Sequence, residues 1–282
     1  MDIRLIAIDM DGTLLDDEKR LSERNRAALK ACLDRGIYIV PATGRPAGGI
    51  PEAVCSIPGI RYGILTNGAK VADLETGKII AEAQIGWEQA VQVLEFLSQF
   101  PAAYDPYIGG RGKMEGRFRD HLDRYGLPPA MQKLVLSTRD QVEDEIALVR
   151  DGQLSVEKIN VFTADRKLRA MLWERLEGFE GLAVTSSLEY NLEINAAAAT
   201  KGNGLLCLAE YLGLKPEQTM AFGDGSNDLS MIQAAGLGVA MENAMENAME
   251  ILKQQADYIT GSNQEDGVAS AIEHFILSAA RQ

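Results

Sequence analysis

Short apolar runs alternate with amphipathic stretches through the first 70 residues of the chain. Leu5–Ile8 is continuously apolar, as expected of a strand buried on both faces, and residues 37–40 and 64–65 form two further short runs. Between the first two runs, Ser22 is placed to cap a helix that Gly36 can end. This rhythm of strand, helix and strand predicts a parallel sheet with helices on its faces.

The same rhythm returns in the last third of the chain. Strands are predicted at 192–194, 220–222, 238–241 and 257–259, and helices at 201–211, from about 228, after 241, and at 267–277. We therefore predict that the two ends of the chain build one α/β, Rossmann-like domain, with a parallel sheet flanked by helices.

The middle of the chain differs in composition, with several glycines and a Pro128–Pro129 pair. Helical patterns at 87–99, 140–150 and 165–177 alternate there with strand-like runs at 156–162 and 182–185. This pattern predicts a separate α+β module inserted into the first domain. The expected boundaries are 1–83 and 189–282 for the core domain and 84–188 for the inserted cap domain.

The composition is that of a folded soluble protein, with 46% hydrophobic and 24% charged residues in a chain of 282. A formal net charge of −13 argues against general binding to nucleic acid or anionic membranes, because both favour a basic face. No stretch approaches the roughly 20 apolar residues of a membrane span, and the three scattered cysteines are expected to be buried thiols. We expect a cytoplasmic monomer or small homo-oligomer.

Two acidic residues follow the first predicted strand, in the segment Asp9-Met10-Asp11-Gly12-Thr13. In open α/β sheets, sites lie beyond the carboxyl ends of the strands, and in an extended segment residues two apart point the same way. One carboxylate can then attack a reacting centre while the other holds or accepts a proton. A polar turn at the end of a strand is the alternative interpretation of this short segment.

A second acidic cluster, Asp224 and Asp228, also follows a predicted buried strand and opens a helix. Carboxylate oxygens are hard ligands that suit Mg²⁺, so this cluster and the first could meet at one metal ion. An Asp-rich helix cap would explain the cluster equally well. The spacing of neither cluster fits an EF-hand loop, and the chain has no Walker A loop.

Two further polar segments lie beside predicted strands. Thr43-Gly44-Arg45 follows the second strand, where a hydroxyl and backbone N–H groups can hold phosphate oxygens. Lys201 opens a predicted helix, and its charge would lie beside a helix N-terminus, which itself attracts anions. Each signal is weak alone, but four polar clusters at the ends of strands predict one phosphate-handling site.

Together these segments resemble the haloacid dehalogenase superfamily of phosphohydrolases, in the Cof-like subgroup with an α/β cap. The matching segments are DMDGT from Asp9, ATGRP from Ala42, TNGA from Thr66, KG at Lys201, GDGSND from Gly223, AGLGVAM from Ala235, ADYIT from Ala256 and NQEDGVA from Asn263. The resemblance implies a Mg²⁺-dependent phosphatase that hydrolyses small phosphomonoesters, with sugar phosphates favoured.

The resemblance also implies roles for the acidic residues. Asp9 would be the nucleophile that forms an aspartyl-phosphate, and Asp11 would protonate the leaving alcohol and then activate water. The metal would be held by Asp9, by Asp224 and by the backbone carbonyl of Asp11, with Asp228 supporting its waters. We expect a raised proton affinity for Asp11 in the closed site, and an Asp9 kept ionised by Lys201.

The phosphoryl group has its own set of expected ligands. By resemblance these are Thr43, Gly44, Arg45, Asn67, Lys201 and Asn227. The cap would close over the site, where Arg111, Arg117, Arg119 and Lys158 are candidates for substrate contacts, although each is also typical of a solvated surface charge.

Two other functions use the same residues. A phosphomutase would return the phosphoryl group to its substrate, and a phosphate-binding regulatory protein would lack turnover; the fold does not separate them. The tetrapeptide repeat at 241–250, MENAMENAME, is expected to lengthen a surface helix without a role in function, with Asn247-Ala248 as the pair that matches the family.

Overall fold

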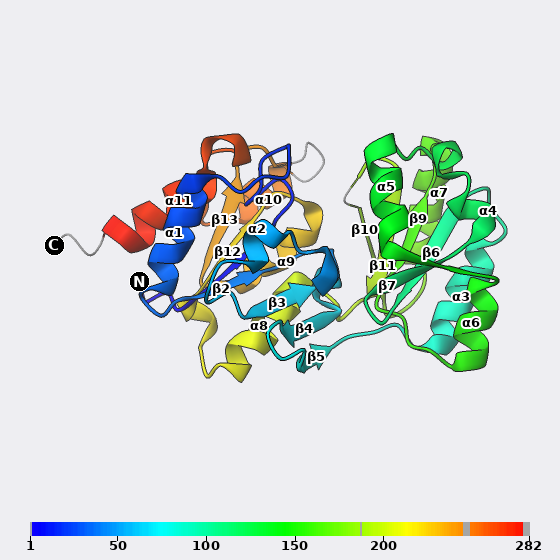
Figure 1. Ribbon diagram of the computed structural model, residues 1–282, viewed down its shortest axis with the longest axis horizontal. Coiled ribbons are helices and arrows are strands. Elements are labelled where there is room, and N and C mark those ends of the chain that lie inside the picture. The colour runs from blue at the N-terminus through cyan, green and yellow to red at the C-terminus, as the bar shows by residue number, and fades with distance from the viewer. Residues whose placement is uncertain (1, 187, 245–248, 279–282) are drawn as a thin grey trace. The chain divides into compact units, whose positions relative to one another are not determined.

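A computed structural model describes residues 2–186, 188–244 and 249–278, and the chain divides into two compact units (Figure 1). The first unit consists of Met1–Glu82 and Thr200–Gln282, and the second consists of Ala83–Ala199. The two ends of the chain therefore fold together, and the middle folds as a unit of its own.

The first unit is built on a five-stranded sheet in which neighbouring strands are parallel. In spatial order its strands are β14 (Tyr258–Thr260), β13 (Leu237–Met241), β12 (Thr219–Gly223), β1 (Leu5–Ile8) and β2 (Tyr38–Pro41). Because all five run the same way, the residues that follow β1, β2 and β12 meet at one edge of the sheet. The predicted parallel sheet is confirmed.

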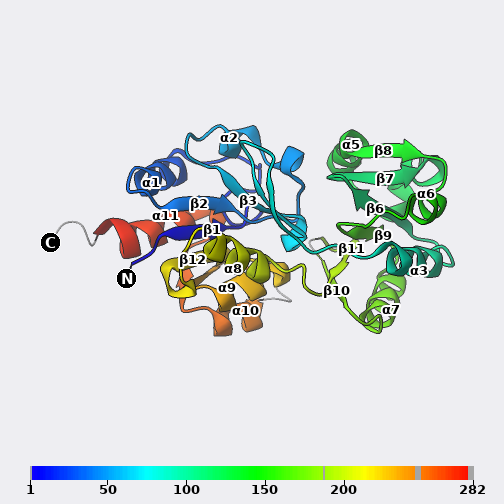
Figure 2. The same cartoon turned by 90° about the horizontal axis from the view of Figure 1, so that it is seen from below.

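Helices cover both faces of this sheet (Figure 2). Ile6 and Ile8 point into a core shared with α1 (Glu23–Leu33) and α11 (Gly267–Ile272), and Ser22 caps α1 by accepting the N–H of Asn25. The alternate residues Leu5 and Ala7 pack towards the other face. That face is covered by α8 (Lys201–Tyr211) and α9 (Leu229–Ala234), while α2 (Glu52–Cys55) buries Val54 in the first core and α10 (Met249–Gln255) buries Leu252 beside α9 and β13.

A small antiparallel sheet follows β2 in the same unit, formed by β3 (Tyr62–Leu65), β4 (Lys70–Asp73) and β5 (Ile79–Glu82). The sequence predicted residues 64–65 as a further strand of the parallel sheet, but a single parallel bridge between Ala42 and Ile64 is their link to it. Gly68, at φ 92°, turns the chain back immediately after β3. A hairpin therefore forms here in place of a helical crossover.

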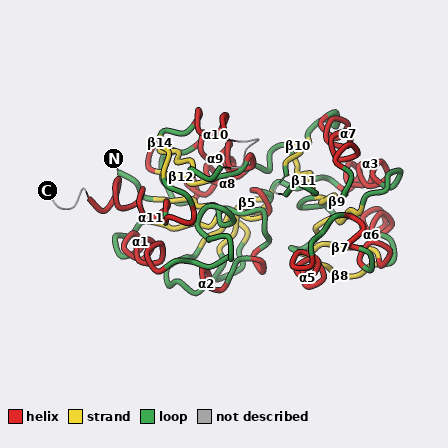
Figure 3. Tube along the Cα trace, turned by 90° about the horizontal axis from the view of Figure 1, so that it is seen from above, coloured by secondary structure: helices red, strands yellow, loops and turns green. Residues whose placement is uncertain are grey.

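The second unit is a six-stranded sheet with helices on it. In spatial order the strands are β10 (Leu182–Thr185), β11 (Asn191–Ala196), β9 (Ile159–Phe162), β6 (Ala103–Ile108), β7 (Arg111–Glu115) and β8 (Arg139–Val142), antiparallel except for β7 and β8. Its helices are α3 (Trp87–Leu97), α4 (Gly116–Arg119), α5 (Pro129–Thr138), α6 (Glu145–Gly152) and α7 (Arg166–Glu177). Figure 3 shows α3, α6 and α7 (red) lying together along the strands of this unit.

Strand β11 lies in this second sheet, whereas its sequence position predicted it in the core domain. It pairs with β9 and β10, and Leu192 and Ile194 are buried in the core of the second unit. The second unit therefore extends to Ala199, beyond the expected boundary at 188. An alternating strand in front of a helix looks the same in sequence whether it pairs with the sheet of one unit or of the other.

The structure differs from the sequence prediction in several smaller details. Helix α6 begins at Glu145 rather than at 140, because Asp144 caps it and residues 139–142 form β8. Cys32 is buried as expected, but Cys55 and Cys207 are exposed; all three are free thiols. Four residues of the MENAMENAME repeat, 245–248, lie outside the described residues; of the rest, Met241 ends β13, residues 242–244 are not helical, and α10 begins at Met249. Within the described ranges, no helix combines the length and apolarity needed to cross a membrane.

Candidate active site

The first acidic segment lies directly beyond β1 at the carboxyl edge of the core sheet. The Asp9 N–H donates to the carbonyl of Phe222 at 3.0 Å, which continues the pairing of β1 with β12 past the end of the strand. Gly12 lies at φ 89°, and a Cβ there would come within 2.4 Å of Oδ2 of Asp224. The Thr13 hydroxyl donates to Oδ1 of Asp224 at 2.7 Å. The turn after β1 therefore positions Asp224 as well as Asp9.

Lys201 reaches the same point from the start of α8, which Thr200 caps. Its Nζ lies 2.6 Å from Oδ1 of Asp9 and 2.6 Å from Oδ1 of Asp228, and the side chain is fully buried. Gly68 allows this approach, since a Cβ on it would lie 2.1 Å from the Thr200 carbonyl oxygen. Residues distant in sequence are thus joined around one ammonium group.

Three carboxylates, those of Asp9, Asp224 and Asp228, offer ligand atoms within 4.8 Å of one another. Asp228 uses both oxygens within the protein, because Oδ1 accepts from Lys201 and Oδ2 accepts the N–H groups of Asp224 and Gly225 at 3.0 and 2.9 Å. Among the described residues, no hydrogen-bond donor reaches Oδ2 of Asp9 or Oδ2 of Asp224. These two oxygens could hold a metal ion, with Asp228 supporting the site from behind.

The electrostatics of the cluster fit a divalent cation. Burial raises the pKa of Asp9 well above its ordinary value; Lys201 lowers it, but Asp228, Asp224 and Asp11 raise it further. Burial and Asp228 likewise raise the pKa of Asp224 to about 7. Lys201 therefore acts on Asp9 in the predicted direction, but burial and the neighbouring carboxylates outweigh its effect on the pKa. Hard carboxylate oxygens with excess negative charge are the donor set that Mg²⁺ favours.

Asp11 lies apart from this cluster and is paired with two cations. Arg45 binds both of its oxygens, with Nε 2.8 Å from Oδ2 and Nη2 2.7 Å from Oδ1, and Lys19 Nζ lies 2.9 Å from Oδ1. Burial acts to raise the pKa of Asp11, but Arg45 and Lys19 outweigh it and the pKa is lowered. The rise in proton affinity predicted for the closed site is not present in this arrangement, because Arg45 and Lys19 pair with the carboxylate.

The expected phosphate ligands come together from three loops. The Asn67 N–H donates to the Thr43 carbonyl at 3.0 Å, and Asn227 Nδ2 donates to Oδ1 of Asn67 at 3.2 Å. Thr66 and Asn67 both have positive φ, at 52° and 59°, which is unusual for a β-branched residue such as threonine. The Thr43 hydroxyl oxygen accepts the Arg45 N–H at 3.1 Å, so its own hydrogen is left to donate to a ligand. Gly44 lies between these two residues in the same loop.

Sequence reasoning missed contributions from Lys19 and Asn243. No motif marks Lys19. Asn243 Nδ2 donates to the Gly12 carbonyl at 2.8 Å, and its Oδ1 accepts the Asn263 N–H at 2.9 Å. Asn243 belongs to the first Asn-Ala pair of the repeat, whereas we assigned the second pair, 247–248, which lies outside the described residues. The repeat itself gives no sign of the contact with the turn after Asp9.

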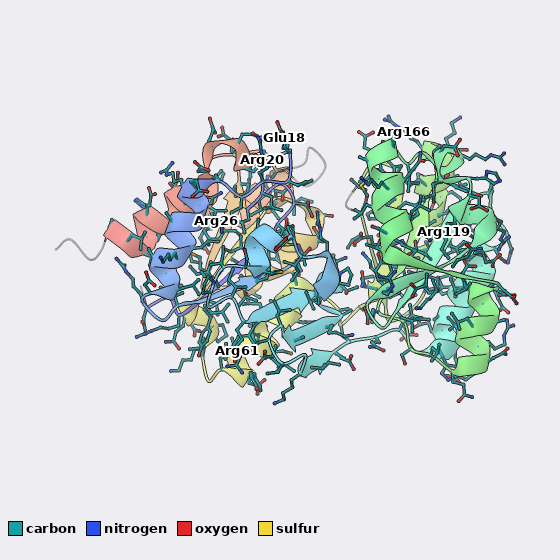
Figure 4. The ribbon with its side chains drawn as sticks, in the orientation of Figure 1. Glu18, Arg20, Arg26, Arg61, Arg119 and Arg166 are labelled. Carbon is teal, nitrogen blue, oxygen red and sulfur yellow. The ribbon has the colours of Figure 1, made fainter. Side chains whose placement is uncertain are left out.

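The cap candidates have partners within the second unit. Arg111 pairs with Asp140 at 2.7 Å and Arg117 with Glu115 at 2.5 Å. Arg119, labelled in Figure 4, donates to the carbonyl oxygens of residues 139 and 136. These contacts favour structural roles for the three arginines. Lys158 is buried, with its Nζ 3.2 Å from Oε1 of Glu193.

Comparison with known proteins identifies a family. Residues 6–272 match the model of a family described as haloacid dehalogenase-like hydrolase. The 5-amino-6-(5-phospho-D-ribitylamino)uracil phosphatase YcsE of Bacillus subtilis (strain 168) is 33% identical, over 98% of this chain and 97% of its own.

Solved structures agree as well. A haloacid dehalogenase-like hydrolase from B. subtilis has a TM-score of 0.83 and 30% identity, covering 97% of this chain and all of that one. A sugar phosphatase of haloacid dehalogenase subclass IIB has a TM-score of 0.79 and 25% identity, covering 96% of this chain and 98% of its own. The chain therefore belongs to the haloacid dehalogenase-like hydrolases, as a Cof-like phosphatase whose second unit is the inserted cap domain.

Proposed function

We propose that the chain is a Mg²⁺-dependent phosphatase that hydrolyses small phosphomonoesters through an aspartyl-phosphate at Asp9. The observation that carries this proposal is the arrangement around Asp9. One of its oxygens is held by Lys201 at 2.6 Å, and the other is without a donor among the described residues and lies next to the carboxylate of Asp224. A carboxylate with one oxygen held by a cation and the other without a hydrogen-bond donor is suited to attack a phosphorus atom.

The first step transfers the phosphoryl group to the protein. A carboxylate oxygen of Asp9 forms a bond to phosphorus while the bond from phosphorus to the leaving alcohol breaks. Asp11 gives its proton to the departing oxygen, so that the alcohol leaves neutral. Lys201 and the Thr43 hydroxyl bind the equatorial phosphoryl oxygens, whose charge must be neutralised in the transition state.

The second step returns Asp9 to its starting state. Water gives a proton to Asp11 as its oxygen attacks phosphorus, and the bond from phosphorus to Asp9 breaks to release inorganic phosphate. Asp11 has its lowered pKa in the arrangement described, and an ionised carboxylate is the form that accepts this proton. The two steps therefore need Asp11 in two protonation states.

Mg²⁺ would be held by Asp9, Asp224 and the backbone carbonyl of Asp11, with Asp228 and Asn227 in supporting roles. When bound, it supplies positive charge that offsets the repulsion between Asp9 and the phosphoryl group. The protein itself supplies a buried cluster whose carboxylates outnumber its cations.

We propose sugar or sugar-alcohol phosphates as the substrate class. The relatives support this class, because one is named for a phosphorylated ribityl compound and one solved structure is described as a sugar phosphatase. A small phosphorylated metabolite would then be the main partner of the chain.

The test is release of inorganic phosphate from a panel of sugar and sugar-alcohol phosphates, with Mg²⁺ and with chelator. Wild type is compared with Asp9→Asn and with Asp34→Asn, which changes an exposed carboxylate at the far end of α1. Release that needs both Mg²⁺ and Asp9 supports the proposal. Activity that survives Asp9→Asn contradicts it, and release that requires a sugar bisphosphate points to a mutase.

A further inference from the structure

Arg45 lies in a loop where the sequence predicts a ligand of the phosphoryl group, yet its guanidinium group is engaged elsewhere. Nε and Nη2 bind the two oxygens of Asp11 at 2.8 and 2.7 Å, and Nη1 donates to the Gly49 carbonyl at 3.0 Å. Parallel hydrogen bonds from one guanidinium to one carboxylate fix both the position and the plane of that carboxylate.

The backbone of Arg45 is held as firmly as its side chain. Its N–H donates to the Thr43 hydroxyl oxygen at 3.1 Å, and its carbonyl accepts the Thr66 N–H at 3.1 Å. The side chain is 25% exposed, so it is partly shielded from competing water. Arg45 therefore offers Asp11 a preorganised partner anchored between the loops that follow β2 and β3.

Lys19 is a weaker partner for the same carboxylate. Its side chain is 53% exposed, and its single ammonium group lies 2.9 Å from Oδ1 of Asp11. An exposed, flexible pair of this kind constrains geometry little. The orientation of Asp11, whose own side chain is 36% exposed, is therefore set mainly by Arg45.

We infer that Arg45 is a positioning residue that orients the Asp11 carboxylate for proton transfer, and that it is not a ligand of the phosphoryl group. The inference rests on the proposed function, in which Asp11 protonates the leaving alcohol. Each carboxylate oxygen can accept more than one hydrogen bond, so the arginine fork leaves Asp11 able to meet the substrate oxygen. A general acid needs this fixed geometry, because proton transfer requires close hydrogen-bond contact.

Substrates with different leaving groups distinguish a residue that positions Asp11 from a ligand of the phosphoryl group. An alkyl phosphate expels an alkoxide that needs a proton, whereas p-nitrophenyl phosphate expels a stable phenolate that does not. We expect Arg45→Ala to lower kcat/KM on the order of 100-fold for a sugar phosphate, the usual contribution of a positioned acid, and to change it little for p-nitrophenyl phosphate. Inhibition by inorganic phosphate should be unchanged. Equal losses on both substrates together with weaker phosphate inhibition would overturn the inference.

A double-mutant cycle tests whether Arg45 acts through Asp11. In an Asp11→Asn background, followed with p-nitrophenyl phosphate and with the sugar phosphate, adding Arg45→Ala should cause no further loss. A further loss on the sugar phosphate as large as in the wild-type background, or a clear loss on p-nitrophenyl phosphate, means that Arg45 acts on something other than Asp11.

Two more variants guard against a general loss of structure. Arg45→Lys keeps the charge without the fork and should show a smaller loss, again selective for the sugar phosphate. Arg61→Ala removes an arginine that forms a similar pair with Asp73 away from the site, and it should leave both activities unchanged (Figure 4). Wild type that hydrolyses neither substrate would refute the proposed function itself, whereas a non-selective loss in both Arg45 variants refutes the positioning role alone.

Discussion

Buried charge is arranged differently in the two units. In the first unit, Lys201 contacts two carboxylates, Asp9 and Asp228, each at 2.6 Å, with more acidic groups close by. In the second unit, buried Arg139 pairs with a single carboxylate, Asp105, at 3.0 Å. A matched pair is typical of a structural role, whereas a cluster with excess like charge costs stability and is typical of a functional site. The comparison therefore locates chemistry in the first unit.

The largest effect is expected for Lys201→Met. The substitution leaves Asp9 and Asp228 buried without their cation, which should cost about 3–5 kcal/mol of unfolding free energy. It should also abolish phosphate release, because Lys201 is assigned to the phosphoryl oxygens. Chemical denaturation and phosphate assays measure the two losses, with Lys215→Met on the surface as the control. A Lys201→Met variant with wild-type activity would show that Lys201 and its carboxylate cluster are not needed for catalysis.

Arg139→Met should lose a similar amount of stability, about 3–5 kcal/mol, because it strands the buried Asp105 carboxylate. Arg150→Met, which breaks an exposed pair with Glu95, should cost only about 0–1 kcal/mol. Restoring neutrality with Asp105→Leu in the Arg139→Met background should recover much of the loss. If the double variant is no more stable than the single one, the pair is not a matched structural unit as the comparison assumes.

A third measurement uses Mg²⁺ to offset the excess negative charge of the carboxylate cluster in the first unit. A ligand that binds only the folded state stabilises it by about 2.7 kcal/mol at a concentration 100 times its Kd. Mg²⁺ should therefore raise the Tm of wild type, and it should do so much less for Asp224→Asn, which lacks one of the two open carboxylates. Equal shifts in the two proteins would mean that any bound metal lies elsewhere.

Sequence reasoning was most successful where a buried strand ends in a polar motif. The strand at Leu5–Ile8 and the helix at Lys201–Tyr211 have the predicted bounds. The carboxylates of Asp9, Asp224 and Asp228 lie together, as parallel strands with adjacent ends require. Each of these predictions depends on a local pattern whose consequence in three dimensions is fixed by sheet topology.

The sequence predictions failed mainly where the outcome depends on which partner a residue or strand contacts. An arginine binds carboxylates and phosphates with the same fork, so the sequence alone did not show that Arg45 binds Asp11. Strands β6 and β7 were missed because Ala103–Ile108 contains a proline and Arg111–Glu115 is largely polar. In the same way, β11 carries the correct strand signal but gives no sign of which sheet it joins.

The smallest expected effect concerns Glu145 and Glu115 in the second unit. These two carboxyl groups lie close together and are an exception to the matched charge pairs of that unit. Oε1 of Glu145 accepts the Glu115 N–H at 2.7 Å, while its Oε2 is buried without a partner among the described residues. Burial, together with Glu115, raises the pKa of Glu145 to about 9 from its ordinary 4.5. The protonated form is thus favoured in the folded state, so its contribution to stability is complete below pH 4.5 and is lost as the pH rises towards 9.

Glu145→Gln removes this titration and keeps the shape of the side chain. We expect it to raise the unfolding free energy at pH 7 by about 1–2 kcal/mol, the scale of an unsatisfied buried polar group. The gain should vanish near pH 4, where the wild-type carboxyl group is protonated in both states. Denaturation at several pH values measures the gain, and Glu143→Gln, an exposed neighbour, should show none. A gain that does not vary with pH would instead assign the effect to packing, and the second unit would then contain no like-charge exception to its matched pairs.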